Sequence, residues 1–334
     1  MSCWIGQVNQ AVPTTFRGMT SALSMGIAMT IDEIMNLRAQ VWDEHPLITE
    51  TAILPTFAGK DVVARVWEVA RKGRASIAFF AQPLSGKSTC TRLIAAEMKR
   101  KKPGCGVMVY EAAEDDRPAE GRLISDILNK MNYAPKIASD LAGKRTQLHR
   151  ALLAMSGESR HLFLIFDEAQ DLSCREFAAL KSVINRLVRE LVKVTVVLFG
   201  QVELKEKKKQ LKAARSDLEK RFMAELLEFK GIQNAAELEP LLAAIDTRSE
   251  FPTGSGLSYL HLLLPRFYEG GGRLAGCGNL FWHELQQRRL PGIGTVVDMS
   301  SVASFLASLV IHLRNLDSAD LKNTPELLRQ IHVV

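Results

Sequence analysis

Apolar and amphipathic runs alternate along residues 61–229 of this chain. Four short, almost wholly apolar runs, with a weaker fifth, have the length and composition of strands that are buried on both faces of a parallel sheet. Longer runs between them place apolar residues at helical spacing. Strands separated by helices of this length predict an α/β fold with a doubly wound parallel sheet. The expected strands are residues 75–80, 106–112, 161–166, 193–200 and 224–229.

Amphipathic periodicity and capping residues mark the expected helices. Thr30 precedes an apolar pattern that Pro46 ends, and Gly73 closes a second helix. The remaining segments follow the strands in turn. The expected helices are residues 30–47, 61–73, 88–102, 121–133, 144–155, 175–191 and 204–222.

The pattern changes after about residue 232 and divides the chain. Helical runs with glycine-rich interruptions then predict a small α-helical lid subdomain over 233–334, after an α/β domain over 30–232. Residues 1–29 carry little charge and are rich in Ser, Thr, Gly and Met, so we expect them to be poorly ordered or to lie upstream of the natural start.

Composition excludes several classes of protein. No apolar stretch approaches the roughly 20 residues that span a bilayer, and the first 30 residues lack the pattern of a secretory signal. The five cysteines show no metal-ligand spacing, which favours reduced thiols and a cytoplasmic location. A balance of 43 Lys and Arg against 37 Asp and Glu gives a net charge of +6, which permits nucleic-acid binding without requiring it.

A phosphate-binding loop follows the first expected strand. The pattern G-x-x-x-x-G-K-[ST] converges backbone N–H groups on phosphate oxygens, while its lysine reaches the β- and γ-phosphates and its hydroxyl holds Mg²⁺. Ala81 replaces the first glycine, which costs little if its φ is negative. The expected nucleotide-binding residues are Pro83, Leu84, Ser85, Gly86, Lys87, Ser88 and Thr89.

Two adjacent carboxylates end the apolar run 161–166. Asp167 is expected to bind Mg²⁺ together with Ser88, at the end of a strand beside the loop, and Glu168 to polarise the attacking water. A single acidic turn would be commonplace, but both elements together, about 80 residues apart, predict a site for ATP and Mg²⁺.

Two further residues are candidates for catalysis. Gln201 ends the strand 193–200, where it can position water beside the γ-phosphate, although a plain turn glutamine is the alternative. Arg221 precedes the last strand, and in ring-forming ATPases an arginine there reaches the neighbouring subunit's γ-phosphate. Arg215 is its rival, and a surface ion pair is the other interpretation.

Basic residues offer a candidate DNA surface. Runs at 99–104 and 205–215 are most simply solvated faces. Arg122, Lys144, Arg145 and Arg150 could instead line a central pore and follow a DNA backbone without reading bases.

The motifs distinguish between nucleotide-dependent machines. "DEAQD" also occurs in superfamily-1 helicases, but only about 160 residues follow Asp171, too few for a second motor domain. A small-molecule kinase would rarely keep the Asp-Glu pair. Together, "AQPLSGKST", "LFLIFDEAQDL", "VVLFGQVEL" and "LEKRF" resemble the AAA+ ATPases of transposition, the TnsC/TniB/MuB group, over about residues 50–245.

This resemblance implies an ATPase that assembles on double-stranded DNA as a ring or short filament of identical subunits. It would link a target-selection protein to the transposase, with ATP hydrolysis releasing the assembly. Compact members of this length are similar to those of CRISPR-associated transposons, in which the selector is a TniQ-type protein. The alternatives are an ExeA-like secretion ATPase and a plain nucleotide-dependent interaction switch.

Overall fold

The computed structural model describes residues 29–73, 75–114, 119–288 and 297–321. Contacts divide the chain into two compact units: residues 59–230, and residues up to 58 together with those from 231 onward. This division differs from the expected boundaries, because residues 30–58 group with the C-terminal helices and not with the α/β domain. The expectation for residues 1–29 lies, except for Met29, outside the described residues.

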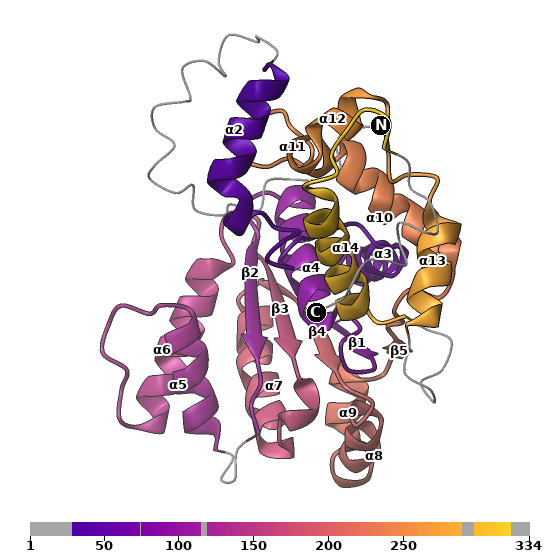
Figure 1. Cartoon of the computed structure of the whole chain (residues 1–334). Helices are drawn as coiled ribbons and strands as arrows, with labels where there is room; N and C mark the ends of the chain where they lie inside the picture. The colour runs from indigo at the N-terminus through magenta and orange to yellow at the C-terminus, as the bar shows by residue number, and fades with distance from the viewer. Residues whose placement is uncertain (1–28, 74, 115–118, 289–296, 322–334) are drawn as a thin grey trace. The chain divides into compact units, whose positions relative to one another are not determined.

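The unit of residues 59–230 contains a five-stranded, all-parallel sheet in the order β2-β3-β4-β1-β5 (Figure 1). All five expected strands are present, and the predicted doubly wound α/β fold is confirmed. β3 and β4 are buried along almost their whole length, as expected of central parallel strands. The strands are β1 (Ser76–Phe80), β2 (Gly106–Glu111), β3 (His161–Asp167), β4 (Lys193–Gly200) and β5 (Leu226–Glu228).

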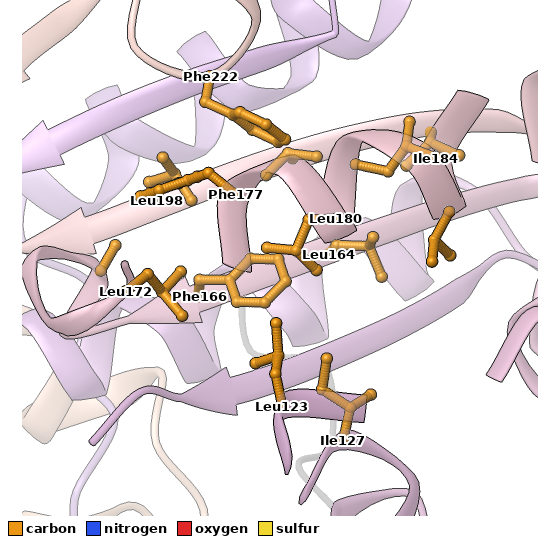
Figure 2. Close-up of a cluster of buried hydrophobic side chains, with 14 of the residues drawn as sticks. Leu123, Ile127, Leu164, Phe166, Leu172, Phe177, Leu180, Ile184, Leu198 and Phe222 are labelled. Carbon is orange, nitrogen blue, oxygen red and sulfur yellow. The ribbon is translucent and has the colours of Figure 1, made fainter. Parts of the chain in front are cut away.

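Helices cover both faces of this sheet. Side chains of α5, α6, α7, α8 and α9 form one buried cluster with alternate residues of β3 and β4, including Leu164 and Phe166 of β3 and Phe177 and Leu180 of α7 (Figure 2). α4 packs against β2 and β3. On the face of the sheet opposite that cluster, Phe79 of β1 stacks on Phe199 of β4. The helices of this unit are α3 (Phe57–Lys72), α4 (Lys87–Lys101), α5 (Glu120–Lys130), α6 (Leu141–Met155), α7 (Cys174–Arg189), α8 (Leu204–Ala214) and α9 (Ser216–Phe222).

The single helix predicted over 204–222 is wrong, because the structure divides it at Arg215. The backbone there is extended, with φ −151° and ψ 78°, and the Arg215 guanidinium binds both carboxylate oxygens of Asp217 at 2.9 Å. Leu211 of α8 and Leu218 of α9 are both buried. Periodicity could not reveal this break, since the apolar spacing continues across it.

The second unit is helical. A capping box between Thr30 and Glu33 begins α2, which ends at Val41 before a 3₁₀ turn and not at Pro46. Arg38 of α2 pairs with the buried Asp317 at 3.4 Å, which accounts for the grouping of α2 with the C-terminal helices. Its elements are α2 (Ile31–Val41), η2 (Trp42–Glu44), α10 (Ala235–Thr247), α11 (Tyr259–Leu263), α12 (Pro265–Glu269), α13 (Gly278–Gln287) and α14 (Met299–Leu313).

Two carboxylates of α10, the buried Asp246 and the half-buried Glu239, organise the glycine-rich loop of the helical unit. Asp246 accepts hydrogen bonds from the backbone N–H groups of Leu274 and Ala275, and Glu239 accepts from Gly276 and Gly278. Burial raises the pKa of the Asp246 carboxyl. Over the described ranges, no helix is long and apolar enough to cross a membrane.

Candidate nucleotide site

Three strand ends bring the predicted site together. Because the sheet is parallel, the loop after β1 and the ends of β3 and β4 meet at its carboxyl edge. We expected Asp167 to end a strand directly beside the loop. In the structure β4 lies between β3, which bears Asp167, and β1, which precedes the loop. Asp167 nevertheless reaches α4, where its Oδ2 accepts a hydrogen bond from Ser88 Oγ at 2.9 Å.

The loop has the backbone expected of a phosphate cradle. Gly86 adopts the left-handed conformation, with φ 90° and ψ 21°, immediately before α4. Lys87 is buried, and Ser85 Oγ is a buried hydroxyl without a hydrogen-bond partner among the described residues. Pro83 and Leu84 are exposed, and Thr89 lies in the first turn of α4.

Ala81 is compatible with this geometry. It is buried and not among the residues with positive φ, and its backbone N–H donates to Gly200 O at 3.0 Å. Alanine therefore replaces the usual glycine here without backbone strain.

The two carboxylates occupy different environments. Asp167 is buried at the end of β3, and this burial raises the pKa of its carboxyl, partly offset by the hydrogen bond from Ser88. Glu168 is half-buried and has a left-handed backbone, with φ 50° and ψ 41°. A non-glycine residue in this conformation is strained, and such strain clusters at functional sites.

Glu168 lies at the centre of a polar network. Its Oε1 is 3.9 Å from Lys87 Nζ, while its Oε2 accepts hydrogen bonds from Gln201 Nε2 at 3.3 Å and from Gln170 Nε2 at 2.7 Å. The structure thus brings together Lys87, Glu168 and Gln201, as expected. Sequence analysis missed Gln170, although it lies within the quoted "DEAQD", because no periodicity or spacing shows where a turn residue points.

These residues fit a nucleotide with Mg²⁺. An unsatisfied buried hydroxyl at Ser85 and a buried ammonium at Lys87 suit phosphate oxygens. Ser88 and Asp167 supply the oxygen donors that Mg²⁺ prefers. No group of three or more His, Cys, Asp or Glu side chains among the described residues could hold a metal ion. Mg²⁺ would therefore also need phosphate and water oxygens, as is usual for this ion.

Arg221 lies away from this cluster. Its backbone carbonyl accepts a hydrogen bond from Ser76 Oγ at the first residue of β1, roughly 13 Å of strand from the end that bears the loop. Partial burial lowers the pKa of its guanidinium. Within the part of the chain that the structure describes, no carboxylate forms an ion pair with Arg221. Its rival Arg215 is bound to Asp217.

The four basic candidates lie on α5 and α6, which pack side by side next to β2 (Figure 1). Arg122, Arg145 and Arg150 are exposed and Lys144 is half-buried. Lys144 Nζ donates to a backbone carbonyl of α5, and Arg145 forms a bidentate ion pair with Glu120, at 2.5 and 2.6 Å. The charge of Arg145 is thus already compensated within the chain.

Comparison with solved structures gives likenesses of low sequence identity. The ORC2 protein of Aeropyrum pernix, solved in ADPNP and ADP complexes, is 14% identical, with a TM-score of 0.52 over 86% of this chain and 70% of that one. The Aeropyrum pernix ORC1 protein in complex with DNA is 13% identical, with a TM-score of 0.48 over 86% of this chain and 68% of that one. Domain III of the Thermotoga maritima replication initiation protein DnaA is 14% identical, with a TM-score of 0.44 over 86% of this chain and 97% of that one.

Sequence comparisons identify the domain itself. No curated protein sequence matches the chain. A family model described as an AAA domain matches residues 70–207, from the end of α3 to the start of α8, and thus includes the loop, both carboxylates and Gln201. This match over residues 70–207 supports an ATPase, in a unit with the P-loop α/β fold of AAA+ proteins.

Proposed function

We propose that this ATPase binds ATP through the loop after β1 and hydrolyses it with Glu168. Lys87 would contact the β- and γ-phosphates, and Glu168 and Gln201 would orient the water that attacks the γ-phosphorus. Mg²⁺, held by Ser88 and Asp167, would neutralise phosphate charge when bound. The contacts among these side chains support this assignment: Ser88 with Asp167 at 2.9 Å, Gln201 with Glu168 at 3.3 Å, and Lys87 with Glu168 at 3.9 Å.

We further propose that the active form is an assembly of copies of this chain. Arg221 carries this proposal: its guanidinium is partly buried, none of the described carboxylates forms an ion pair with it, and its backbone carbonyl lies at the first residue of β1, the end opposite the nucleotide loop. Such a group can serve a neighbour's γ-phosphate but not its own. Arg215, paired with Asp217, is the weaker candidate.

The proposed role is regulation of DNA transposition. The motif resemblance to the TnsC/TniB/MuB group supports an assembly on double-stranded DNA that links a TniQ-type selector to the transposase, with hydrolysis controlling release. Arg122, Lys144, Arg145 and Arg150 are the proposed backbone contacts, and Arg145 would exchange Glu120 for a phosphate.

The catalytic assignment is tested by Glu168→Gln, which retains the side chain's shape and removes its charge. ATP affinity should persist while turnover falls by about 10²-fold or more, the scale of positioned acid–base groups. Glu158→Gln is a matched control, because Glu158 is exposed in the turn before β3. Lys87→Ala should abolish ATP binding in a chain that still folds, and undiminished affinity there would refute the loop assignment.

Capture on duplex DNA tests the larger role. Binding should require ATP, ignore sequence, and weaken with salt with a slope of about −0.9 per phosphate contacted. Neutralising Lys144, Arg145 and Arg150 together should weaken binding to all sequences alike, and Arg150→Gln should reduce the slope more than Arg145→Gln does. DNA binding that is independent of ATP, or a loss confined to one sequence, would contradict the proposal.

A further inference from the structure

Gln170 connects two parts of the nucleotide site with its single side-chain amide. It lies in the 3₁₀ turn η3 (Ala169–Asp171), directly after β3. Its Nε2 donates to Glu168 Oε2 at 2.7 Å, and its Oε1 accepts the backbone N–H of Gln201 at 3.0 Å. The amide therefore ties the proposed catalytic carboxylate, which follows β3, to the end of β4.

The hydrogen bonds also distinguish the two oxygens of Glu168. Both amide donors, from Gln170 and Gln201, converge on Oε2. Oε1 forms no hydrogen bond with any described residue. Its ion-pair partner, Lys87 Nζ, lies 3.9 Å away, beyond hydrogen-bond distance. Oε2 is thus held, and Oε1 is the oxygen left to accept a hydrogen bond from water.

Gly200 provides the space that this arrangement needs. A Cβ atom built on Gly200 would lie 2.6 Å from Gln170 Oε1, closer than Cβ atoms of folded proteins approach other heavy atoms, whereas its other neighbours, atoms of Leu204, are at 3.1 and 3.2 Å. The φ of Gly200 is not among the positive ones. The requirement for glycine is therefore the volume taken by Gln170 and not the backbone conformation.

We propose that Gln170 is a positioning residue for ATP hydrolysis: it fixes the orientation of the Glu168 carboxylate, with Oε1 toward the attacking water, and couples that orientation to Gln201 at the end of β4. This inference rests on the proposed catalytic role of Glu168. Gln170 itself need not touch the nucleotide. Its loss should change the rate of hydrolysis and leave nucleotide affinity unchanged.

The first test is the separation of turnover from binding. Gln170→Ala and Gln170→Glu both remove the donor to Glu168, the second with little change in size. In each, kcat should fall about 10- to 100-fold, the range for loss of a hydrogen bond to a charged group, while the Kd for ATP stays within about twofold. Equal losses in kcat and affinity, or an unchanged kcat, would overturn the proposal.

The second test uses the space at Gly200. Gly200→Ala should displace Gln170 and lower kcat in the wild-type background, but should lower kcat much less in a Gln170→Ala background, where only the close contacts to Leu204 remain. An equal loss in both backgrounds would overturn the proposal. If Gly200→Ala does not fold, as judged by thermal unfolding and ATP binding, the two Gln170 variants still decide the question.

Glu168→Gln separates this inference from the proposed function. Full turnover in Glu168→Gln would overturn both, since Gln170 would then have no catalytic carboxylate to position. An inactive Glu168→Gln beside fully active Gln170 variants would overturn only the role of Gln170. Loss of turnover in all three, with ATP affinity retained, is the expected result.

Discussion

The buried His45 should make the helical unit lose stability as the pH falls. His45 is fully buried, and its ring makes edge contacts with Phe251 and Tyr259 at centroid distances of 5.0 and 4.9 Å. Its Nδ1 accepts the backbone N–H of Leu47 at 3.1 Å, so this nitrogen carries no proton. Burial lowers the pKa of His45 from 6.5 to about 3.

The sign and size of the effect follow from linkage. Because the folded-state pKa is the lower one, the unfolded chain binds the proton first, and stability is lost as pH falls from 6.5 toward 3. Between pH 6.5 and pH 5 the loss is about 1.5 pH units at about 1.36 kcal/mol each, or about 2 kcal/mol. Above pH 6.5 this contribution is fully present.

This loss of stability is measured by urea unfolding at pH 7 and pH 5. Tryptophan fluorescence reports the transition, and Trp42 of the same unit contributes to that signal. His45→Asn keeps an acceptor near the position of Nδ1 and removes the titration. Whatever it costs at pH 7, its loss between pH 7 and pH 5 should be about 2 kcal/mol smaller than that of the wild type. His283→Asn, at an exposed position, should keep the wild-type loss. An equal pH dependence in His45→Asn and wild type would refute the reasoning.

Three other predictions concern the cores and the subunit boundary. Phe177→Ala empties a fully buried position of the sheet unit and should lower the free energy of unfolding by about 3–5 kcal/mol in urea titrations. Asp246→Ala leaves the buried N–H of Leu274 without its acceptor and should cost about 2 kcal/mol or more, with faster amide hydrogen exchange in the glycine-rich loop. Arg221→Ala should bind ATP but fail to hydrolyse it or assemble. Mixing it with Glu168→Gln should restore part of the ATPase activity, and no recovery in demonstrably mixed assemblies would count against a shared site.

The local elements and the kind of chemistry could be predicted from the amino-acid pattern alone. The strands over 75–80 and 161–166 could be read because buried parallel strands need uninterrupted apolar runs. Gly86, Lys87 and Ser88 after one strand and Asp167 and Glu168 after another predicted a site for ATP and Mg²⁺, since phosphate and Mg²⁺ demand those groups at strand ends. The capping box of α2 was equally local, being set by Thr30 and Glu33 alone.

How these elements meet became clear only in the folded chain. The insertion of β4 between β1 and β3, the break at Arg215, and the packing of α2 with the C-terminal helices all depend on contacts between distant residues. Gln170 shows the limit most clearly: its partners are a carboxylate two residues away and a backbone N–H that is 31 positions along the chain. A turn has no periodic pattern of apolar residues from which the direction of a side chain can be predicted. The direction of Gln170 depends on the space that the folded strands leave, here the space beside Gly200.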